Sequence, residues 1–248
     1  MSVRPLFYSF PRVIGHRGAR GLAPENTLAA IRAARDCGLS WIEVDVRLTR
    51  DAVPVLSHDP VIAPGDGALP VRIAALDAEM LRKRIPSVLG LADALALARA
   101  SGLNVNVELK SEGSRNSVLA RKVAAQITAF DRISGPSVLL SSFEKDLVAD
   151  MAALLPHIPR ALILARAAPR DIEAARRLEC VSVHIARRGA DFGTIAAIHR
   201  HGMRCAVYTV NRVAAARRLF AAGADGVFTD RPDRFSAIEK NRPRGWSF

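Results

Sequence analysis

The chain has 248 residues, half of them hydrophobic, and carries a formal net charge of +12 at pH 7. This length suits one large domain with a sizeable core. The positive charge is scattered without a run of five or more basic residues, so we expect no specific nucleic-acid partner. No uninterrupted apolar stretch approaches about 18 residues, and no transmembrane segment is therefore expected.

The cysteine content favours a reducing compartment. Cys37, Cys180 and Cys205 are an odd number with no CxxC spacing, so we expect neither a disulfide framework nor a zinc site. Residues 1–11 contain no apolar run long enough for a secretory signal. A cytoplasmic location is the resulting expectation.

In chain order, the first predicted elements are a short strand, a helix and a longer strand. Their ranges are residues 12–15, 25–37 and 40–48. Asn26 or Thr27 could cap the start of the helix, and Gly38 ends it. A further extended piece, residues 53–57, then leads to His58.

Two carboxylates occupy one face of the longer strand. Glu43 and Asp45 alternate with Ile42, Val44 and Val46, and alternate residues of a strand point to opposite faces. Neighbouring carboxylates repel each other and raise each other's pKa, and a hard divalent cation with oxygen ligands removes that penalty. A strand with one face in water shows the same alternation, so the pattern alone leaves both interpretations open.

An irregular segment, residues 59–86, follows His58. It is rich in turn-forming residues, namely Pro60, Pro64, Gly65, Gly67 and Pro70. The composition predicts a loop that could cover one end of a barrel, with a short helix around residues 77–82. We interpret this segment as a short insertion after the second strand.

From residue 86 onward, helices and strands alternate strictly. The expected strands are residues 103–109, 137–141, 160–164, 181–185, 203–208 and 226–229. The expected helices are residues 88–101, 115–130, 145–155, 171–178, 191–201, 212–222 and 232–239. Eight strands, each followed by a helix, predict an α/β fold, a single (β/α)₈ TIM-barrel domain over residues 1–248. A doubly wound open sheet is the alternative, but no GxGxxG motif follows the first strand.

The third predicted barrel strand carries polar residues on the face that would point into the barrel. Asn106, Glu108 and Lys110 alternate there with aliphatic residues. Charges that point inward must be compensated. A cation bound by Glu43, Asp45 and Glu108 would do so and would leave Lys110 for a substrate phosphate or carboxylate. An incidental ion pair at a surface strand end is the alternative for Glu108 and Lys110.

Several short motifs together resemble the glycerophosphodiester phosphodiesterase family. They are HRG (residues 16–18), PENT (24–27), ExDV (43–46), TxD (49–51), HD (58–59), ELK (108–110), SSF (141–143), YTVN (208–211) and GVFTDRP (226–232). The resemblance covers nearly the whole chain, and its first five motifs coincide within one βαβ-sized segment. It implies a TIM-barrel phosphoric diester hydrolase that converts a small-molecule glycerophosphodiester into an alcohol and sn-glycerol 3-phosphate.

The resemblance also implies roles for individual residues. His16 and His58 would be the catalytic acid–base pair, and imidazole titrates near neutral pH as such a pair requires. Glu43, Asp45 and Glu108 would hold Ca²⁺ or Mg²⁺, since carboxylate oxygens suit either ion. The assignment of acid and base stays open, as does the choice between water and a substrate hydroxyl as nucleophile.

Substrate contacts are implied for Arg17, Lys110 and Tyr208. Arg17 and Lys110 would contact the phosphate, and Tyr208 stands where the family more often has Trp and would line the glycerol part of the cavity. The insertion lacks the family's Arg-Thr-Thr after the His-Asp pair, so its substrate contacts are in question. A lysophospholipase D-like enzyme and a non-catalytic phosphodiester-binding barrel are the alternatives. Among the other histidines, His184 could line the same rim.

Overall fold

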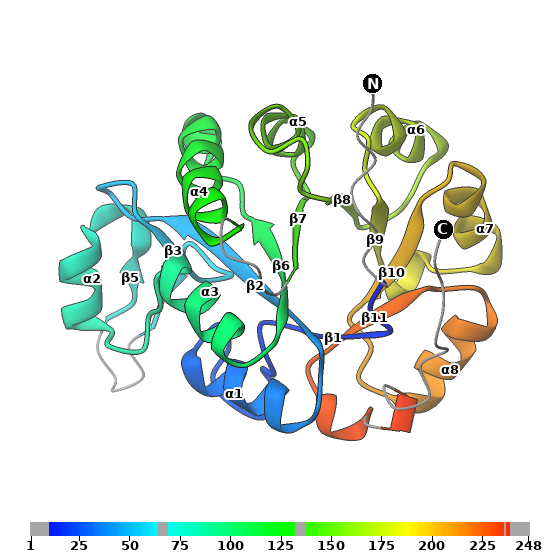
Figure 1. Ribbon diagram of the computed structural model, residues 1–248, viewed down its shortest axis with the longest axis horizontal. Coiled ribbons are helices and arrows are strands. Elements are labelled where there is room, and N and C mark those ends of the chain that lie inside the picture. The colour runs from blue at the N-terminus through cyan, green and yellow to red at the C-terminus, as the bar shows by residue number, and fades with distance from the viewer. Residues whose placement is uncertain (1–9, 64–68, 132–136, 236, 239–248) are drawn as a thin grey trace.

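The computed structural model describes residues 10–63, 69–131, 137–235 and 237–238 of the chain. Within these ranges, eight parallel strands form a closed barrel (Figure 1). In the order in which they pair, they are β1 (Val13–Gly15), β2 (Trp41–Leu48), β6 (Asn104–Leu109), β7 (Val138–Ser142), β8 (Arg160–Leu164), β9 (Ser182–Ala186), β10 (Arg204–Tyr208) and β11 (Gly226–Thr229). Closure results because β1 pairs with both β2 and β11.

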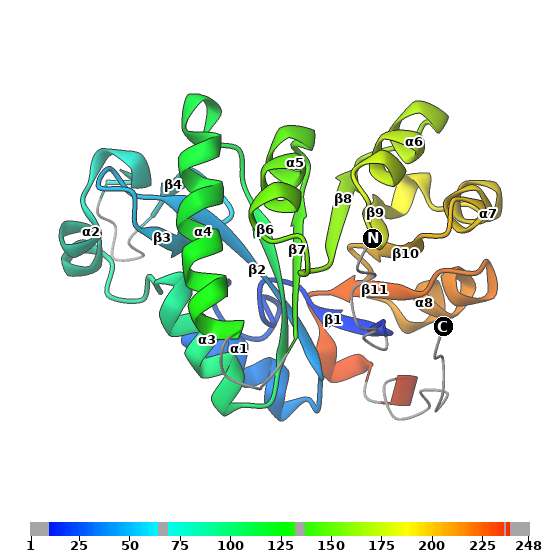
Figure 2. The same cartoon turned by 45° about the horizontal axis from the view of Figure 1, so that its top comes forward.

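Helices cover the outside of this barrel (Figure 2). They are α1 (Leu28–Asp36), α3 (Leu91–Ala100), α4 (Asn116–Asp131), α5 (Lys145–Leu154), α6 (Pro169–Arg177), α7 (Phe192–Arg200) and α8 (Val213–Ala221). Their apolar faces pack on the outward residues of the strands, as Ile31 and Leu95 do in the same buried cluster as Val44 and Val107. The predicted (β/α)₈ barrel is therefore confirmed.

The inward face of the strands divides into an apolar and a polar part. Ile14, Trp41, Leu139, Ala206 and Phe228 form a buried cluster of their own inside the barrel. Towards the carboxyl ends of the strands, polar and charged side chains replace them. Sites in this fold lie at that end, because the loops that follow the strands meet there.

The segment after β2 contains more regular structure than the sequence indicated. β3 (Pro54–Leu56) confirms the extended piece expected at residues 53–57 and runs antiparallel to the end of β2. Beyond it, β4 (Val61–Ile62) pairs with β5 (Val71–Arg72), which the sequence did not indicate. A 3₁₀ helix, η1 (Ile73–Ala75), and α2 (Ala78–Arg84) complete the insertion, which projects at one side of the barrel in Figure 1. The expected loop with one helix at 77–82 was correct only for the helix. Two-residue strands are too short to show an alternating pattern.

The remaining boundaries differ at a few helix ends. α1 begins at Leu28 instead of residue 25, because Thr27 is its N-cap and accepts a hydrogen bond from the Ala30 backbone N–H. The last helix, expected at 232–239, is a 3₁₀ turn, η4 (Pro232–Arg234), and part of that range lies outside the described residues. Two further 3₁₀ turns are η2 (Gly113–Arg115) and η3 (Arg187–Gly189). None of the described helices combines the length and apolar character that crossing a membrane requires.

Candidate active site at the carboxyl ends of the strands

Three carboxylates from two adjacent strands meet inside the barrel. Glu43 and Asp45 come from β2, Glu108 comes from β6, and one oxygen of each lies within 4.8 Å of the others. Asp45 and Glu108 are direct neighbours in the strand register. The side chains of Glu43 and Asp45 are only about 1% exposed, which rules out the water-exposed face that the sequence left open. Oxygen ligands at this spacing suit one hard divalent cation.

The carboxylates cannot all carry a charge at low cost in this environment. Burial and the charges of Asp45 and Glu108 raise the pKa of Glu43 well above its ordinary value. Burial and Asp45 raise the pKa of Glu108 to about 7. Burial also opposes ionisation of Asp45, but the charges of Lys110 and Arg17 outweigh it and lower its pKa. A bound dication would supply the missing positive charge.

The oxygen atoms of Glu43 show that the cluster can accept a cation. Its Oε2 accepts a hydrogen bond of 2.7 Å from the Arg17 backbone N–H. Its Oε1 is fully buried and has no hydrogen-bond partner in the part of the chain that the structure describes. A buried carboxylate oxygen normally has a partner. The residues present therefore fit a Ca²⁺ or Mg²⁺ site.

Two basic side chains accompany the carboxylates. Lys110 Nζ lies 2.8 Å from Asp45 Oδ1 and also bonds to Glu108. Arg17 Nε lies 3.4 Å from Asp45 Oδ2, while Arg17 Nη1 donates to both oxygens of Glu25. Burial disfavours the charged form of Lys110, but Asp45 and Glu108 outweigh it and raise its pKa. The sequence prediction placed Arg17 and Lys110 at the site, and it missed Glu25.

His16 is held by a residue from the other end of the chain. It follows β1, and its Nδ1 lies 2.6 Å from Oδ1 of Asp230, which follows β11. Asn211 donates a 2.7 Å hydrogen bond to Asp230 Oδ2. Burial opposes ionisation of Asp230, but hydrogen bonds with His16 and Asn211 outweigh it and lower its pKa. The ring is thus held through Nδ1, and this pair does not engage its other nitrogen, Nε2.

Sequence reasoning did not place Asp230 or Asn211 in the site. It suggested Asn211 only as a cap of the helix after the seventh strand, and the N-cap of α8 is Arg212 instead. Both Asp230 and Asn211 stand in motifs that carried the family resemblance, YTVN and GVFTDRP. The predicted barrel could have identified Asp230. In a closed barrel the last strand lies beside the first, so a carboxylate directly after β11 is near a histidine directly after β1. The same argument applies to any polar residue at the ends of these two strands.

His58 enters the site from the insertion side. It follows β3, and its Nδ1 lies 2.8 Å from Asp59 Oδ1. Its backbone is held because Arg47 Nε donates to the His58 carbonyl over 2.9 Å. Burial, together with the positive charge of Lys110, lowers the pKa of His58. The ring is therefore largely neutral at pH 7 and able to accept a proton.

An aromatic pair lines the rim near β7 and β10. Tyr208 ends β10, its hydroxyl donates to the Leu164 carbonyl over 3.1 Å, and its ring meets Phe143 edge to face at 6.1 Å. Burial and Glu108 raise the pKa of Tyr208 to about 12, so it stays neutral. Lys110 Nζ lies 6.0 Å from the centre of the Phe143 ring. Tyr208 is thus at the predicted rim, and Phe143, which is 44% exposed, was missed as a site residue.

His184 does not line the rim, contrary to the sequence expectation. Its side chain is buried inside the barrel, where Nε2 lies 3.2 Å from Ser182 Oγ and the ring packs against Phe228. Burial lowers its pKa to about 3. His184 faces inward and lies two residues before the end of β9. Its side chain is therefore below the opening of the barrel.

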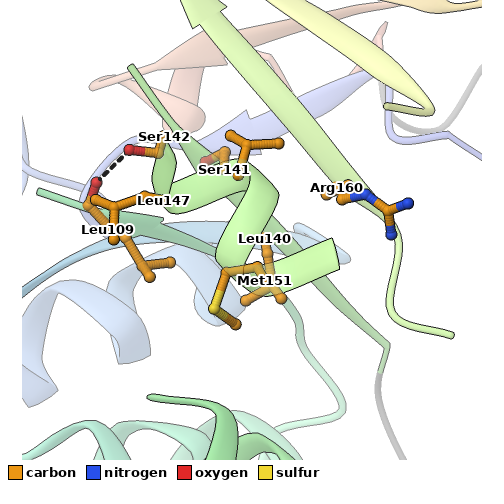
Figure 3. Close-up of a pocket in the computed structure, with 8 residues that line it drawn as sticks. Leu109, Leu140, Ser141, Ser142, Leu147, Met151 and Arg160 are labelled. Atoms are coloured by element: carbon orange, nitrogen blue, oxygen red, sulfur yellow. Dashed lines mark hydrogen bonds between the residues drawn. The ribbon is translucent and has the colours of Figure 1, made fainter. Parts of the chain in front are cut away.

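The cavities near the site differ in character. A cavity of about 10 Å³ lies between β6, β7 and α5, lined mainly by Leu109, Leu140 and Met151, and holds at most one water (Figure 3). A larger pocket of about 280 Å³ lies between the 24–27 turn and the insertion and includes Asn26 and Asp59. Asn26 donates to Asp45, so this larger pocket adjoins the carboxylates. Of these two cavities, only the larger has room for part of a substrate.

Comparison with known proteins agrees with this geometry. Residues 16–234 match the model of the glycerophosphoryl diester phosphodiesterase family. A glycerophosphodiester phosphodiesterase of Caldanaerobacter subterraneus is 28% identical over 234 residues, which cover 89% of this chain and 94% of that protein. A protein of the same name from Bacillus altitudinis is 28% identical over 246 residues, covering 92% of this chain and 98% of its own length.

A solved structure supports the same assignment. A phosphodiesterase of Oleispira antarctica, in complex with the product sn-glycerol-3-phosphate, superposes with a TM-score of 0.86 at 26% identity. The match covers 93% of this chain and 97% of that one. From the matched residues, the barrel and the rim described above, we conclude that the chain belongs to the glycerophosphoryl diester phosphodiesterase family, a family of phosphoric diester hydrolases.

Proposed function

We propose that this protein hydrolyses glycerophosphodiesters to an alcohol and sn-glycerol 3-phosphate with the help of Ca²⁺ or Mg²⁺. The observation that carries the proposal is the buried cluster of Glu43, Asp45 and Glu108 at the same rim as His16 and His58. The product bound by the Oleispira antarctica phosphodiesterase supports the choice of substrate.

Phosphodiester cleavage requires that negative charge on the phosphoryl oxygens be neutralised. When bound, a divalent cation would supply Lewis-acid stabilisation of those oxygens. Lys110 and Arg17 lie at the same carboxylates and would pair with the phosphate as charge-assisted donors. Lys110 and Arg17 are largely buried, and the low dielectric of the interior strengthens each of the pairings.

Proton transfer is assigned to the two histidines. One would accept the proton of the attacking oxygen, from water or a neighbouring substrate hydroxyl, while the P–O bond to the leaving alcohol breaks. The other would donate a proton to that alcohol oxygen. His16 is oriented by Asp230 and His58 by Asp59, so each ring has one nitrogen held and one available.

The test is a substrate panel assayed with and without chelator. Glycerophosphocholine, glycerophosphoethanolamine, glycerophosphoglycerol and lysophosphatidylcholine would be offered to the full-length protein, and release of sn-glycerol 3-phosphate or lysophosphatidic acid would be measured. We expect hydrolysis of the glycerophosphodiesters that EDTA abolishes and that Ca²⁺ or Mg²⁺ restores. The ion that restores activity at the lower concentration identifies the cofactor.

The matched variant is Glu43→Gln, which keeps the size of the side chain and removes a charge. It should weaken cation binding while far-UV circular dichroism stays unchanged. Full activity after exhaustive chelation would contradict the role of the cation. Preference for the lysolipid would point to a lysophospholipase D-like enzyme, and substrate binding without turnover would point to a non-catalytic barrel.

A further inference from the structure

Two inward-facing polar side chains of the barrel are buried without a hydrogen-bond partner in the part of the chain that the structure describes. The amide of Asn106 on β6 is completely buried, and neither Nδ2 nor Oδ1 has a hydrogen-bond partner among the described residues. The hydroxyl of Ser141 on β7 is in the same situation. Buried polar groups in native proteins are nearly always paired with protein or ordered water. We therefore expect Asn106 and Ser141 to form hydrogen bonds with a group that is not part of the described chain, such as an ordered water.

The strand register places each of them beside a carboxylate of the candidate metal site. Asn106 is the direct neighbour of Glu43 across the β2–β6 ladder. Ser141 is the direct neighbour of Glu108 across the β6–β7 ladder. In both cases the two residues of the pair share the inward face, because side chains in register on adjacent strands point the same way.

Among the described residues, no direct hydrogen bond links Asn106 to Glu43 or Ser141 to Glu108. A buried water is the small polar group that could join each pair. Glu43 contributes a matching acceptor, since its Oε1 is also buried without a partner in the described part of the chain. Its other oxygen is already fixed by the Arg17 backbone N–H.

We propose that Asn106 and Ser141 are positioning residues that hold Glu43 and Glu108, through buried water, in the orientation that binds a divalent cation. The inference rests on the proposed function, because it assumes that these carboxylates are metal ligands. A ligand carboxylate that can rotate loses affinity for its cation, and hydrogen bonds from a surrounding polar group prevent the rotation. Asn106 would donate from Nδ2 towards the Glu43 side, and Ser141 would donate from its hydroxyl towards Glu108.

The experiment is calorimetric titration of Ca²⁺ and Mg²⁺ into chelator-stripped full-length protein. The main variant is Asn106→Leu, which keeps the approximate shape and removes both polar atoms. We expect about a 10- to 100-fold weaker Kd for the cation. The Tm of the metal-free variant should not fall, because no hydrogen bond with another described side chain is lost. Ser141→Ala, a smaller change, should also weaken cation binding.

Asn104→Leu is the matched control on the same face of the same strand. Both amide atoms of Asn104 are already used, because Nδ2 donates to the Ser40 carbonyl and Oδ1 accepts from the Ser137 N–H. This variant should lower the Tm and leave the Kd for the cation unchanged. A merely structural role for Asn106 would produce the same result in both asparagine variants.

Cation binding by Asn106→Leu and Ser141→Ala within twofold of the parent protein would overturn the inference while leaving the proposed function intact. If Asn106→Leu does not fold, Ser141→Ala decides the question alone. Failure of the folded parent protein to bind either cation would instead refute the proposed function, and the inference with it.

Discussion

Asp230 is the residue that fixes the orientation of the His16 ring. The two side chains are 2.6 Å apart, and the Asn211 amide holds Asp230 by donating to its Oδ2 and accepting from its backbone N–H. Asp230→Asn keeps the shape but loses the charge and the fixed proton on Nδ1. We expect kcat to fall on the order of 10²-fold or more, with little change in KM.

Steady-state kinetics on a glycerophosphodiester at saturating cation would measure this effect. Asp233→Asn is a suitable control, because this carboxylate is exposed and pairs with Arg231 instead of His16. A kcat for Asp230→Asn within twofold of the parent value would show that the ring needs no such partner.

The two histidines can be assigned by the leaving group of the substrate. His16→Ala and His58→Ala should each lower kcat by about 10² to 10⁴, the usual contribution of one acid or base. A nitrophenyl diester needs little protonation of its leaving group. The acid variant should therefore recover activity on this substrate, and the base variant should not.

The double variant should lose less than the product of the two single losses, because acid and base act in one event. Comparing kcat for the natural diester and the nitrophenyl diester would measure the asymmetry. If both single variants kept near-parental kcat on the natural diester with cation present, the acid–base assignment would be wrong.

The insertion after β2 has a small core of its own, separate from the main core of the barrel. Val55, Val71, Ile73, Leu81, Ile85 and Val88 form this cluster. Because His58 lies between β3 and β4, this core supports the position of a proposed catalytic residue. Loss of packing here should loosen the insertion before it affects the barrel.

Leu81→Ala tests this separation. Truncating a fully buried leucine costs about 2 to 5 kcal/mol of stability. Here the insertion should bear most of this loss. Hydrogen exchange should accelerate in residues 71–85 and stay unchanged in β9 and β10. Met80→Ala on the same helix, with a side chain 52% exposed, should change neither region. Uniform acceleration across the barrel would show that the insertion and the barrel unfold together.

The barrel as a whole encloses one histidine that should make its stability depend on pH. The pKa of His184 is lowered by burial to about 3, below its ordinary value of 6.5. Between these values the unfolded chain binds a proton that the folded chain does not. The contribution of neutral His184 to the free energy of unfolding is therefore fully present above about pH 7. It is lost as the pH falls, by up to about 1.4 kcal/mol per pH unit.

Chemical denaturation at pH 7.5, 6.0 and 5.0 would measure this slope for the parent protein and for His184→Leu. The variant should lose less stability between pH 7.5 and 5.0, whatever its absolute stability. His201→Gln, which alters an exposed histidine, should keep the parental slope. Equal slopes in all three proteins would mean that His184 binds its proton in the folded barrel at the same pH as in the unfolded chain.

Local pattern predicted the fold and the face that Glu43 and Asp45 share, but it did not decide whether that face meets water. The alternation of β2 and β6 placed Glu43, Asp45 and Glu108 on one face, because a strand has a period of two residues. The regular order of strands and helices predicted the barrel, and short motifs identified the family. These features depend on neighbours in sequence or on a repeating period, so one sequence contains them.

Tertiary structure alone decided which groups are paired. His16 and Asp230 are 214 positions apart and meet because barrel closure places β11 beside β1. From its place near a strand end, His184 was expected to be able to line the rim, but it lies two residues before the end of β9 and is buried inside the barrel. That the Asn106 amide has no hydrogen-bond partner among the described residues can be seen only when its neighbours in space are known. Sequence periodicity gives the face on which a side chain lies, whereas depth and partners depend on the register of strands that are distant in the chain.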